Sequence, residues 1–236
     1  MTGSRICVAG IDTATYQHVR PVTPPGTPLT RVLLRENGGP FGAGALVDIG
    51  SVTACPDAPE TEDHAFDMTC AQRVSDVDEA AYLELLGAIG EADIQAAFGS
   101  ALVEVRPCKF AVPAECGERS LAVVPVAAPD LRIKNDKLYL QLNPPATPAD
   151  LRVTDVRFYT ADLTIKRDVV DDVNRRLTAG TGAYAMLGLA RAIHDDTTGR
   201  DLHWLMANGL CLVDRAVGDL GPTFPRYPAH ACVVAA

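Results

Sequence analysis

Near its end the chain carries the run Asp201-Leu202-His203-Trp204-Leu205-Met206-Ala207-Asn208-Gly209-Leu210-Cys211-Leu212-Val213-Asp214, which decides the expected fold. The run holds the only tryptophan, Trp204, and its apolar content predicts a buried strand late in the chain. Residues 184–193 form a second strand-like run, and the link at 195–200 is rich in turn residues. The two runs therefore predict a hairpin that closes a β domain.

Composition limits the class of protein. The 236 residues are enough for one large domain or two small ones, and 47% of them are hydrophobic, as in an ordinary globular protein. The formal charge of −9 argues against a general nucleic-acid coat, because phosphate contacts need lysine and arginine. A basic patch can still lie on an acidic protein, so this exclusion is partial.

The cysteines and the lengths of the apolar runs indicate where in the cell the protein is expected. Seven cysteines are scattered without a CxxC pair, a pattern that fits reduced thiols in a cytoplasm. The N-terminus shows no charged-then-apolar signal segment, and no run approaches the roughly 18 apolar residues that a membrane helix needs. We therefore expect a soluble, cytoplasmic protein without a membrane partner.

Periodicity predicts two successive β units joined by a helix. Residues 5–12 and 45–52 predict strands of the first unit. Residues 75–98 form the best helix of the chain, in which Asp76 and Glu79 resemble a capping box. This helix leads into the second β series.

The second series begins with a predicted strand at residues 120–126. Residues 131–142 alternate cleanly on both sides of Asn135-Asp136, which predicts a hairpin. Residues 151–159 predict a further strand, and residues 166–178 predict a short charged helix.

Two loops carry residues that could take part in catalysis or in ligand binding. The acidic loop at 55–67 could bind a divalent metal or transfer protons, through Glu60, Glu62, Asp63, His64 and Asp67. No known ligand spacing matches, so a solvated loop whose acids cap the backbone is the favoured interpretation. The glycine-rich loop at 37–44 lacks the signatures of a P-loop and of a dinucleotide fold, which favours a plain turn over a ligand contact.

In an ordered series of short segments, the chain resembles a prokaryotic family described as the dual OB-containing domain. The segments are Arg5-Ile6-Cys7-Val8-Ala9-Gly10, Val19-Arg20-Pro21-Val22, Leu46-Val47-Asp48-Ile49, Glu62-Asp63-His64, Val153-Thr154-Asp155, Leu187-Gly188-Leu189-Ala190-Arg191 and His203-Trp204-Leu205-Met206-Ala207-Asn208-Gly209. The resemblance covers nearly the whole chain, and the last two segments are its most specific. It implies two OB barrels in tandem, nucleic acid as the ligand, and often a place in prokaryotic conflict systems.

The expected fold class is therefore mainly β with a few helices, as two tandem OB-like barrels joined by a helix. We place the first OB-like unit at residues 1–75 and a connecting helix and linker at 76–118. The second OB-like unit follows at 119–222, and a C-terminal tail at 223–236.

OB barrels bind single strands with a basic groove and with aromatic side chains on which bases stack. The site that we expect consists of phosphate contacts (Arg20, Arg35, Arg157 and Arg191), a stacking platform (Trp204) and readers of polar edges (His203 and Asn208). Further candidates are the aromatic residues Tyr139, Phe158, Tyr159 and Tyr184. Further basic candidates are Arg31, Lys134, Lys137, Arg152, Lys166, Arg167, Arg175 and Arg176, of which the last two favour a solvated helix face. A β core would also bury such aromatics, and a place in the core is the favoured alternative for Trp204.

Three functions remain open, of which we expect the first. It is non-catalytic binding of nucleic acid or a nucleotide, without a metal or cofactor, and it predicts salt-sensitive binding to single strands. The second is a protein-interaction or sensor module that partners an effector, for which residues 224–234 could dock the partner. The third is a metal- or acid/base-dependent enzyme, whose candidates are His64 or His203 with Asp48, Asp63 or Asp155.

Overall fold

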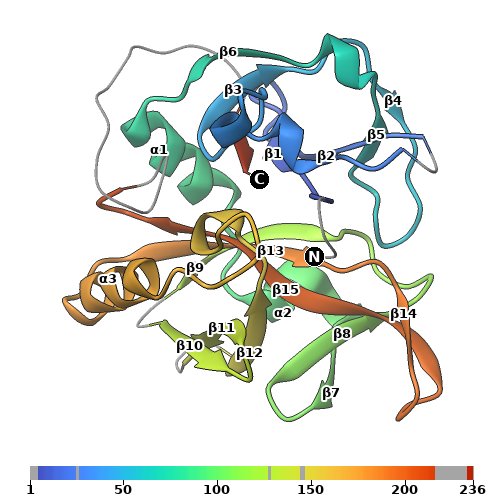
Figure 1. Cartoon of the computed structure of the whole chain (residues 1–236). Coiled ribbons are helices and arrows are strands. Elements are labelled where there is room, and N and C mark those ends of the chain that lie inside the picture. Colours follow the sequence, from blue (N-terminus) through green and yellow to red (C-terminus); the bar gives the residue numbers. More distant parts are fainter. Residues whose placement is uncertain (1–4, 25–26, 127–128, 144–146, 216–232, 236) are drawn as a thin grey trace. The chain divides into compact units, whose positions relative to one another are not determined.

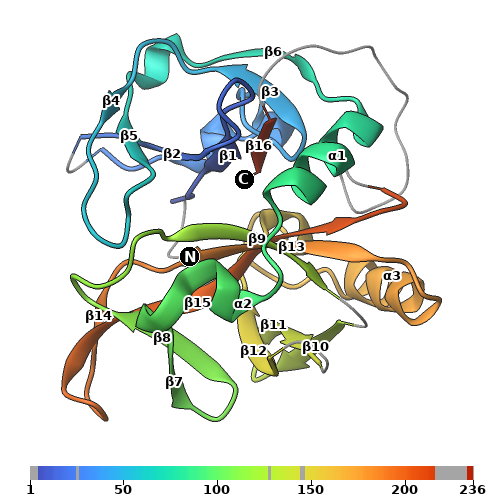
Figure 2. The ribbon, with the colours of Figure 1, turned by 180° about the vertical axis from the view of Figure 1, so that it is seen from behind.

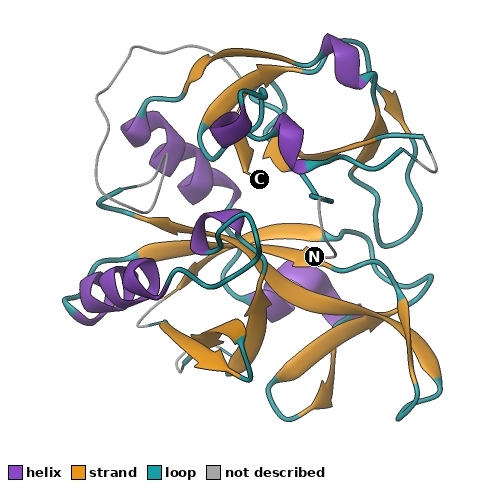
Figure 3. Cartoon of the chain, in the orientation of Figure 1, coloured by secondary structure: helices purple, strands orange, loops and turns teal. Residues whose placement is uncertain are grey.

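The computed structural model describes residues 5–24, 27–126, 129–143, 147–215 and 233–235. Strands dominate and helices are few, so the expected mainly β class is confirmed (Figure 1; Figure 3). The chain divides into two compact units that are interleaved in sequence. The first holds Met1–Pro56, Glu62–Ile89 and Arg215–Ala236, and the second holds Asp57–Thr61 and Gly90–Asp214.

One sheet organises the first unit. Its strands, in chain order, are β1 (Ala9–Ile11), β2 (His18–Val22), β3 (Ala45–Asp48), β4 (Thr53–Ala54), β5 (Asp63–Ala65), β6 (Gln72–Asp76) and β16 (Val233–Ala235). They lie in the order β4-β5-β2-β1-β16-β3-β6. Strand β16 comes from the expected tail and pairs antiparallel with β1 and with β3. The rest of that tail, residues 223–232 and 236, lies outside the described residues, and so does most of the expected docking segment at 224–234.

The run near the end of the chain that was quoted in the sequence analysis forms the longest strand of the second unit, and the other strands are arranged around it. The strands of this unit are β7 (Val103–Arg106), β8 (Lys109–Pro113), β9 (Leu121–Val126), β10 (Asp130–Lys134), β11 (Lys137–Leu142), β12 (Ala149–Val153), β13 (Ala183–Leu189), β14 (Ile193–Asp195) and β15 (Arg200–Leu212). The sheet has the order β10-β11-β12-β15-β13-β9, and β15 also pairs with β8 and β14. The antiparallel pairing of β13 with β15 confirms the expected closing hairpin. The sheet curls into a half-barrel, which agrees with an OB-like fold (Figure 1).

The expected helix at 75–98 is two helices in the structure, so the prediction of one continuous helix was wrong. Strand β6 takes its first residues, and helices α1 (Glu79–Ile89) and α2 (Ile94–Phe98) follow. The second helix begins after Asp93, whose carboxylate accepts hydrogen bonds from two backbone amides of the first turn. Helix α1 belongs to the first unit and α2 to the second, where α2 packs against β9 (Figure 2).

Turn chemistry explains the hairpin of β10 and β11, which is confirmed in the expected place. Asn135 and Asp136 have positive φ angles of 49° and 55°, the backbone conformation that a two-residue type I′ turn requires. The alternation around this turn buries Leu131, Leu138 and Leu140 on the inner side of the half-barrel. The polar residues between them are therefore left on the outer side.

The expected strand at 151–159 ends early, at Val153. Asp155 accepts a hydrogen bond from the Arg157 amide at 3.0 Å and so begins a short 3-10 helix. The expected charged helix is confirmed as α3 (Arg167–Thr178). The 3-10 helices of the chain are η1 (Arg31–Leu33), η2 (Arg35–Asn37), η3 (Met68–Cys70), η4 (Gly99–Ala101) and η5 (Val156–Phe158).

Candidate functional site

A row of cross-strand neighbours defines the outer face of the second unit's sheet. Arg132 on β10 lies opposite Tyr139 on β11. Tyr139 in turn lies opposite Arg152 on β12, and Arg152 lies opposite Met206 on β15. Opposed side chains point to the same side of a sheet, so all four residues share one face. None of them is buried, whereas Leu151, the strand neighbour of Arg152, is almost fully buried on the other side.

Two lysines lie beside the Tyr139 ring on this face, both on the side where Asp150 lies. The Nζ atoms of Lys109 and Lys134 lie 4.2 Å and 5.8 Å from the ring centroid, within the range of a cation–π contact. Both ammonium groups also form ion pairs with the Asp150 carboxylate, at 3.2 Å and 3.0 Å. Asp150 thus holds two cations beside one half-buried aromatic ring.

Trp204 lies on the same face. It precedes Met206 by two residues on β15, so the two side chains point the same way. The indole is half-buried, and the Arg106 guanidinium carbon lies 5.2 Å from the ring centroid. Arg106 is opposite Lys109 in the ladder of β7 and β8, which connects the Trp204 pair to the Tyr139 pair. We call this surface the basic–aromatic face and define it by Arg106, Lys109, Arg132, Lys134, Tyr139, Arg152 and Trp204.

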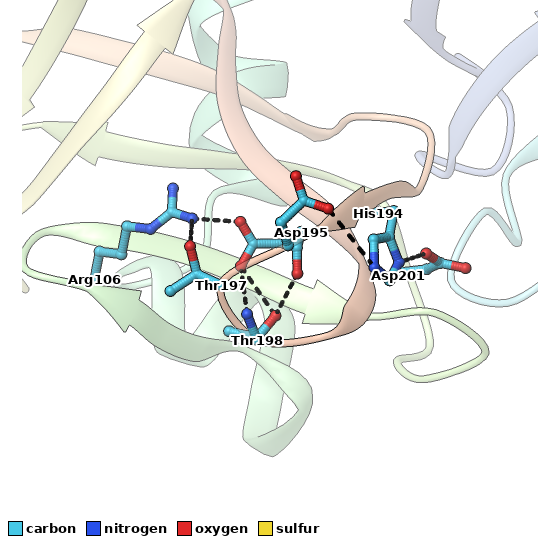
Figure 4. A network of polar contacts seen from close by, with 7 residues as sticks. Arg106, His194, Asp195, Thr197, Thr198 and Asp201 are labelled. Carbon is cyan, nitrogen blue, oxygen red and sulfur yellow. Dashed lines mark hydrogen bonds and ion pairs between the residues drawn. The ribbon is translucent and has the colours of Figure 1, made fainter.

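The turn between β14 and β15 holds Arg106 in place (Figure 4). The guanidinium forms an ion pair with the Asp195 carboxylate and donates a hydrogen bond to Thr197 Oγ1 at 3.1 Å. Asp195 also accepts hydrogen bonds from the amide and the hydroxyl of Thr198, at 3.1 Å and 2.9 Å. Burial alone would raise the pKa of Asp195, but the bonds from Thr198 and the charge of Arg106 outweigh burial and lower that pKa below its usual value.

The basic–aromatic face differs in charge from the chain as a whole, which carries −9. Its basic side chains outnumber the acids beside them, which are Asp130, Asp150 and Asp195. Each of these acids is already paired with a cation of the face, as Asp130 is with Arg132 at 2.6 Å. At Arg106, Lys109, Arg132 and Lys134, an anionic ligand would therefore exchange with a carboxylate partner.

The other aromatic candidates are less exposed. Phe158 and Tyr159 are buried, and the Tyr159 hydroxyl donates a hydrogen bond to the Val153 carbonyl oxygen at 2.8 Å. Burial raises the pKa of Tyr159, and the nearby Arg152 guanidinium opposes this shift. Tyr184 is half-buried on β13. Of the aromatic residues considered, Tyr139 and Trp204 are therefore the ones with a cation against the ring.

The structure brings His203 and Arg191 together, but on the side of β15 opposite to Trp204. His203 Nδ1 lies 2.9 Å from the Ala190 carbonyl oxygen and 3.8 Å from Glu60 Oε1. Arg191 Nη1 forms an ion pair with Glu60 Oε2 at 2.6 Å. Glu60 and His203 are buried, so this cluster ties the segment at 57–61 to the rest of the second unit.

Asn208 has a structural role at the junction of three strands. The ladder of β13 and β15 shifts register beside it, which marks a β-bulge. Thr154, just after β12, donates a hydrogen bond from Oγ1 to Asn208 Oδ1 at 3.0 Å. On β13, Gly188 lies directly against the amide, and a Cβ atom there would come within 2.0 Å of Asn208 Nδ2.

Arg157 is committed to an internal ion pair. Its Nη2 atom lies 2.7 Å from Asp155 Oδ2 and donates a second hydrogen bond to the Leu210 carbonyl oxygen at 2.7 Å. The Asp155 side chain is 0% exposed. This pair fixes η5 against β15 and leaves Arg157 little freedom to contact a ligand.

Arg20 and Arg35 belong to the first unit. Arg20 is buried on β2 and forms an ion pair with Asp63 on β5. Arg35 lies in η2, and its Nη1 atom is 3.0 Å from Asp76 Oδ1 at the end of β6. Of these two arginines, Arg35 is the accessible one.

Two carboxylates among the enzyme candidates pair with arginines. Asp63 is engaged by Arg20 and Asp155 by Arg157. The His64 Nδ1 atom lies 2.8 Å from the Glu62 carbonyl oxygen. Among the described residues, no group of three or more His, Cys, Asp or Glu side chains is arranged to hold a metal ion.

No helix in the described ranges has the length and apolar character needed to cross a bilayer.

Four residues of the site were missed in the sequence, namely Arg106, Lys109, Arg132 and Asp195. Residues 76–118 were expected to hold a connecting helix and a linker, but Lys109–Pro113 is strand β8. The apolar run Phe110-Ala111-Val112 was the available signal, and each of its residues is buried. Nothing local in the sequence indicates that Asp195 holds Arg106 against Trp204.

Comparisons of the chain with protein-family models, curated proteins and solved structures gave no match.

Proposed function

We propose that the chain is a non-catalytic module that binds single-stranded nucleic acid, or a nucleotide, through the basic–aromatic face. The observation that carries this proposal is the half-buried Tyr139 ring with the ammonium groups of Lys109 and Lys134 gathered beside it. In the same row of the sheet, Tyr139 has an arginine on each neighbouring strand. An aromatic ring for base stacking, surrounded by cations for the backbone, is the arrangement used by sequence-tolerant strand-binding proteins.

The clustering of the cation–π pairs supports the proposal more than their number. Such pairs occur about once per 70–80 residues, so the three pairs found in the described part of the chain are an ordinary number. Here all three lie on one side of one sheet, where they form a continuous path from Trp204 to Lys134. That placement favours a shared ligand over three independent stabilising contacts.

The energetics are compatible with binding. Stacking of a base on an aromatic side chain contributes roughly 1–3 kcal/mol, and neutralising phosphates releases counterions. Because Arg106, Lys109, Arg132 and Lys134 are paired with carboxylates before binding, a phosphate that contacts one of them replaces one anionic partner with another. These four cations therefore stay paired in both states, and the release of counterions from the phosphates makes the affinity depend on salt.

The resemblance to the dual OB-containing domain family supports the same ligand class, because OB barrels bind strands across a sheet face. On that resemblance we also propose that the protein acts in the cytoplasm, as a component of a prokaryotic conflict system.

The test is fluorescence anisotropy with labelled single-stranded DNA and RNA over a series of salt concentrations. For a single strand, each phosphate contact contributes about 0.7 to the slope of log affinity against log salt. Lys134→Ala should therefore weaken binding and reduce the slope by about that amount. Arg175→Ala is the matched control, because Arg175 is an exposed arginine on α3, outside the basic–aromatic face. Equal effects of the two substitutions, or no binding at low salt, would overturn the proposal.

A second candidate is docking of an acidic segment of a protein effector, which the basic character of the same face favours. Binding of this kind would depend on salt but not on bases. An abasic oligonucleotide, which has the sugar–phosphate backbone but no bases, separates the two functions. It should bind weakly if stacking on Tyr139 contributes to affinity. It should bind as well as an ordinary oligonucleotide if only charge contributes. The second result would favour the protein partner.

A further inference from the structure

The guanidinium of Arg106 lies over the Trp204 ring. The Arg106 side chain is 46% exposed, whereas the side chain of its partner Asp195 is 9% exposed. The ion pair with Asp195 and the hydrogen bond to Thr197 hold the guanidinium over the indole, and its exposure leaves it within reach of an anion from solution. The indole beneath is half-buried and belongs to the same face as Tyr139.

We infer that Arg106 is a removable cover on a second base-stacking platform, Trp204, and that the ligand is a strand of several nucleotides instead of a mononucleotide. The inference rests on the proposed function and specifies its ligand. A backbone phosphate replaces Asp195 as the partner of Arg106, and the guanidinium moves from the ring to the strand. The uncovered indole then accepts a base.

The spacing of the two platforms sets the length of the ligand. Tyr139 on β11 and Trp204 on β15 are separated by two strand steps across the sheet and by two residues along β15. With strands about 4.8 Å apart and residues about 3.4 Å apart, the separation is roughly 12 Å. One base cannot reach both rings, whereas a short strand can span them. Lys109 and Arg106 lie between the two platforms and can contact the connecting phosphates.

Trp204 itself provides the measurement, because it is the only tryptophan in the chain. We expect an oligothymidylate of about eight nucleotides to quench its emission in parallel with binding measured by anisotropy. Thymidine monophosphate should bind more weakly and leave the emission almost unchanged, because it lacks the connecting phosphate that draws Arg106 from the indole. Binding of the oligonucleotide without any change in emission would overturn the inference and leave the proposed function intact. Absence of oligonucleotide binding would instead contradict the proposed function itself.

Two matched substitutions test the role of Asp195 as the group that holds the cover. Asp195→Asn and Asp130→Asn remove the same charge from the same face, but only Asp195 contacts Arg106. We expect Asp195→Asn to alter the emission of the free protein and to raise oligonucleotide affinity by about five-fold, because Arg106 no longer has to leave a carboxylate partner. Asp130→Asn should leave the emission of the free protein unchanged. Equal emission in both variants would contradict the inference.

The substitution Arg106→Gln removes the guanidinium that covers Trp204. It does not remove the hydrogen bonds between Asp195 and Thr198. It leaves Trp204 uncovered, so the emission of the free protein should change, and the oligonucleotide should still quench it. Affinity should fall, because a phosphate partner is lost. Unchanged emission in folded Arg106→Gln, checked by circular dichroism, would show that the guanidinium does not cover the ring in solution.

Discussion

The guanidinium of Arg106 lies 5.2 Å from the ring centroid of Trp204, and Asp195 holds it there. The three residues come from β7, β15 and β14, so the contact exists only once the second unit has folded. A cation against the ring makes the indole a sensitive reporter of its surroundings. This arrangement leads to the first prediction.

The emission of Trp204 should be insensitive to pH near neutrality. The pKa of Asp195 is lowered from its usual value of 3.8, so the ion pair is fully formed above that value and is lost only as the pH falls through the lowered pKa. We expect constant emission between about pH 8 and pH 5 and a change only below about pH 3.8. Thr198→Val should move this transition to higher pH, because Thr198 supplies hydrogen bonds that lower the pKa. A transition of the wild type centred between pH 5 and pH 8 would contradict the assignment.

Arg157 should matter for stability and not specifically for a ligand. Arg157→Met leaves the Asp155 carboxylate buried without its partner, and breaking a buried pair costs about 3–5 kcal/mol. Arg35→Met removes only an exposed pair with Asp76, for which we expect about 0–1 kcal/mol. Urea unfolding of the two variants measures the difference. A fully stable Arg157→Met variant with reduced strand binding would instead support a phosphate contact at this position.

Gly188 should tolerate no side chain while Asn208 is present. A Cβ atom at Gly188 would lie 2.0 Å from Asn208 Nδ2, so Gly188→Ala should destabilise the protein by about 1–3 kcal/mol through overpacking. Asn208→Ala alone removes the hydrogen bond from Thr154 and should cost about 1 kcal/mol. Chemical unfolding of both single variants and the double variant tests the coupling. A double variant as unstable as the sum of the single effects would rule out the clash.

The elements with local signals were predictable from the sequence. The hairpin around Asn135-Asp136 follows from two residues that tolerate positive φ angles between alternating strands. Helix α3 follows from its own amphipathic pattern. The break between α1 and α2 had a local signal as well, because Asp93 is a good N-cap residue inside the run that suggested a single helix.

The candidate site was predictable only in part, because strand register decides which side chains meet. The aromatic content of β15 pointed to Trp204, and alternation in β11 pointed to Tyr139. The parallel pairing that sets Arg152 beside Met206 has no local signature. For the same reason the sequence could not show that Arg157 is committed to Asp155, or that His203 faces Glu60 instead of the side on which Trp204 lies.

The central claim is that a base stacks on Tyr139 beside Lys109 and Lys134. The most direct test compares Tyr139→Ala with Tyr139→Phe in anisotropy measurements with single-stranded DNA. We predict that Tyr139→Ala lowers affinity by about 5- to 150-fold, which corresponds to about 1–3 kcal/mol of lost stacking, and that Tyr139→Phe binds nearly as well as the wild type. Equal affinity of the wild type and a folded Tyr139→Ala variant would contradict the account.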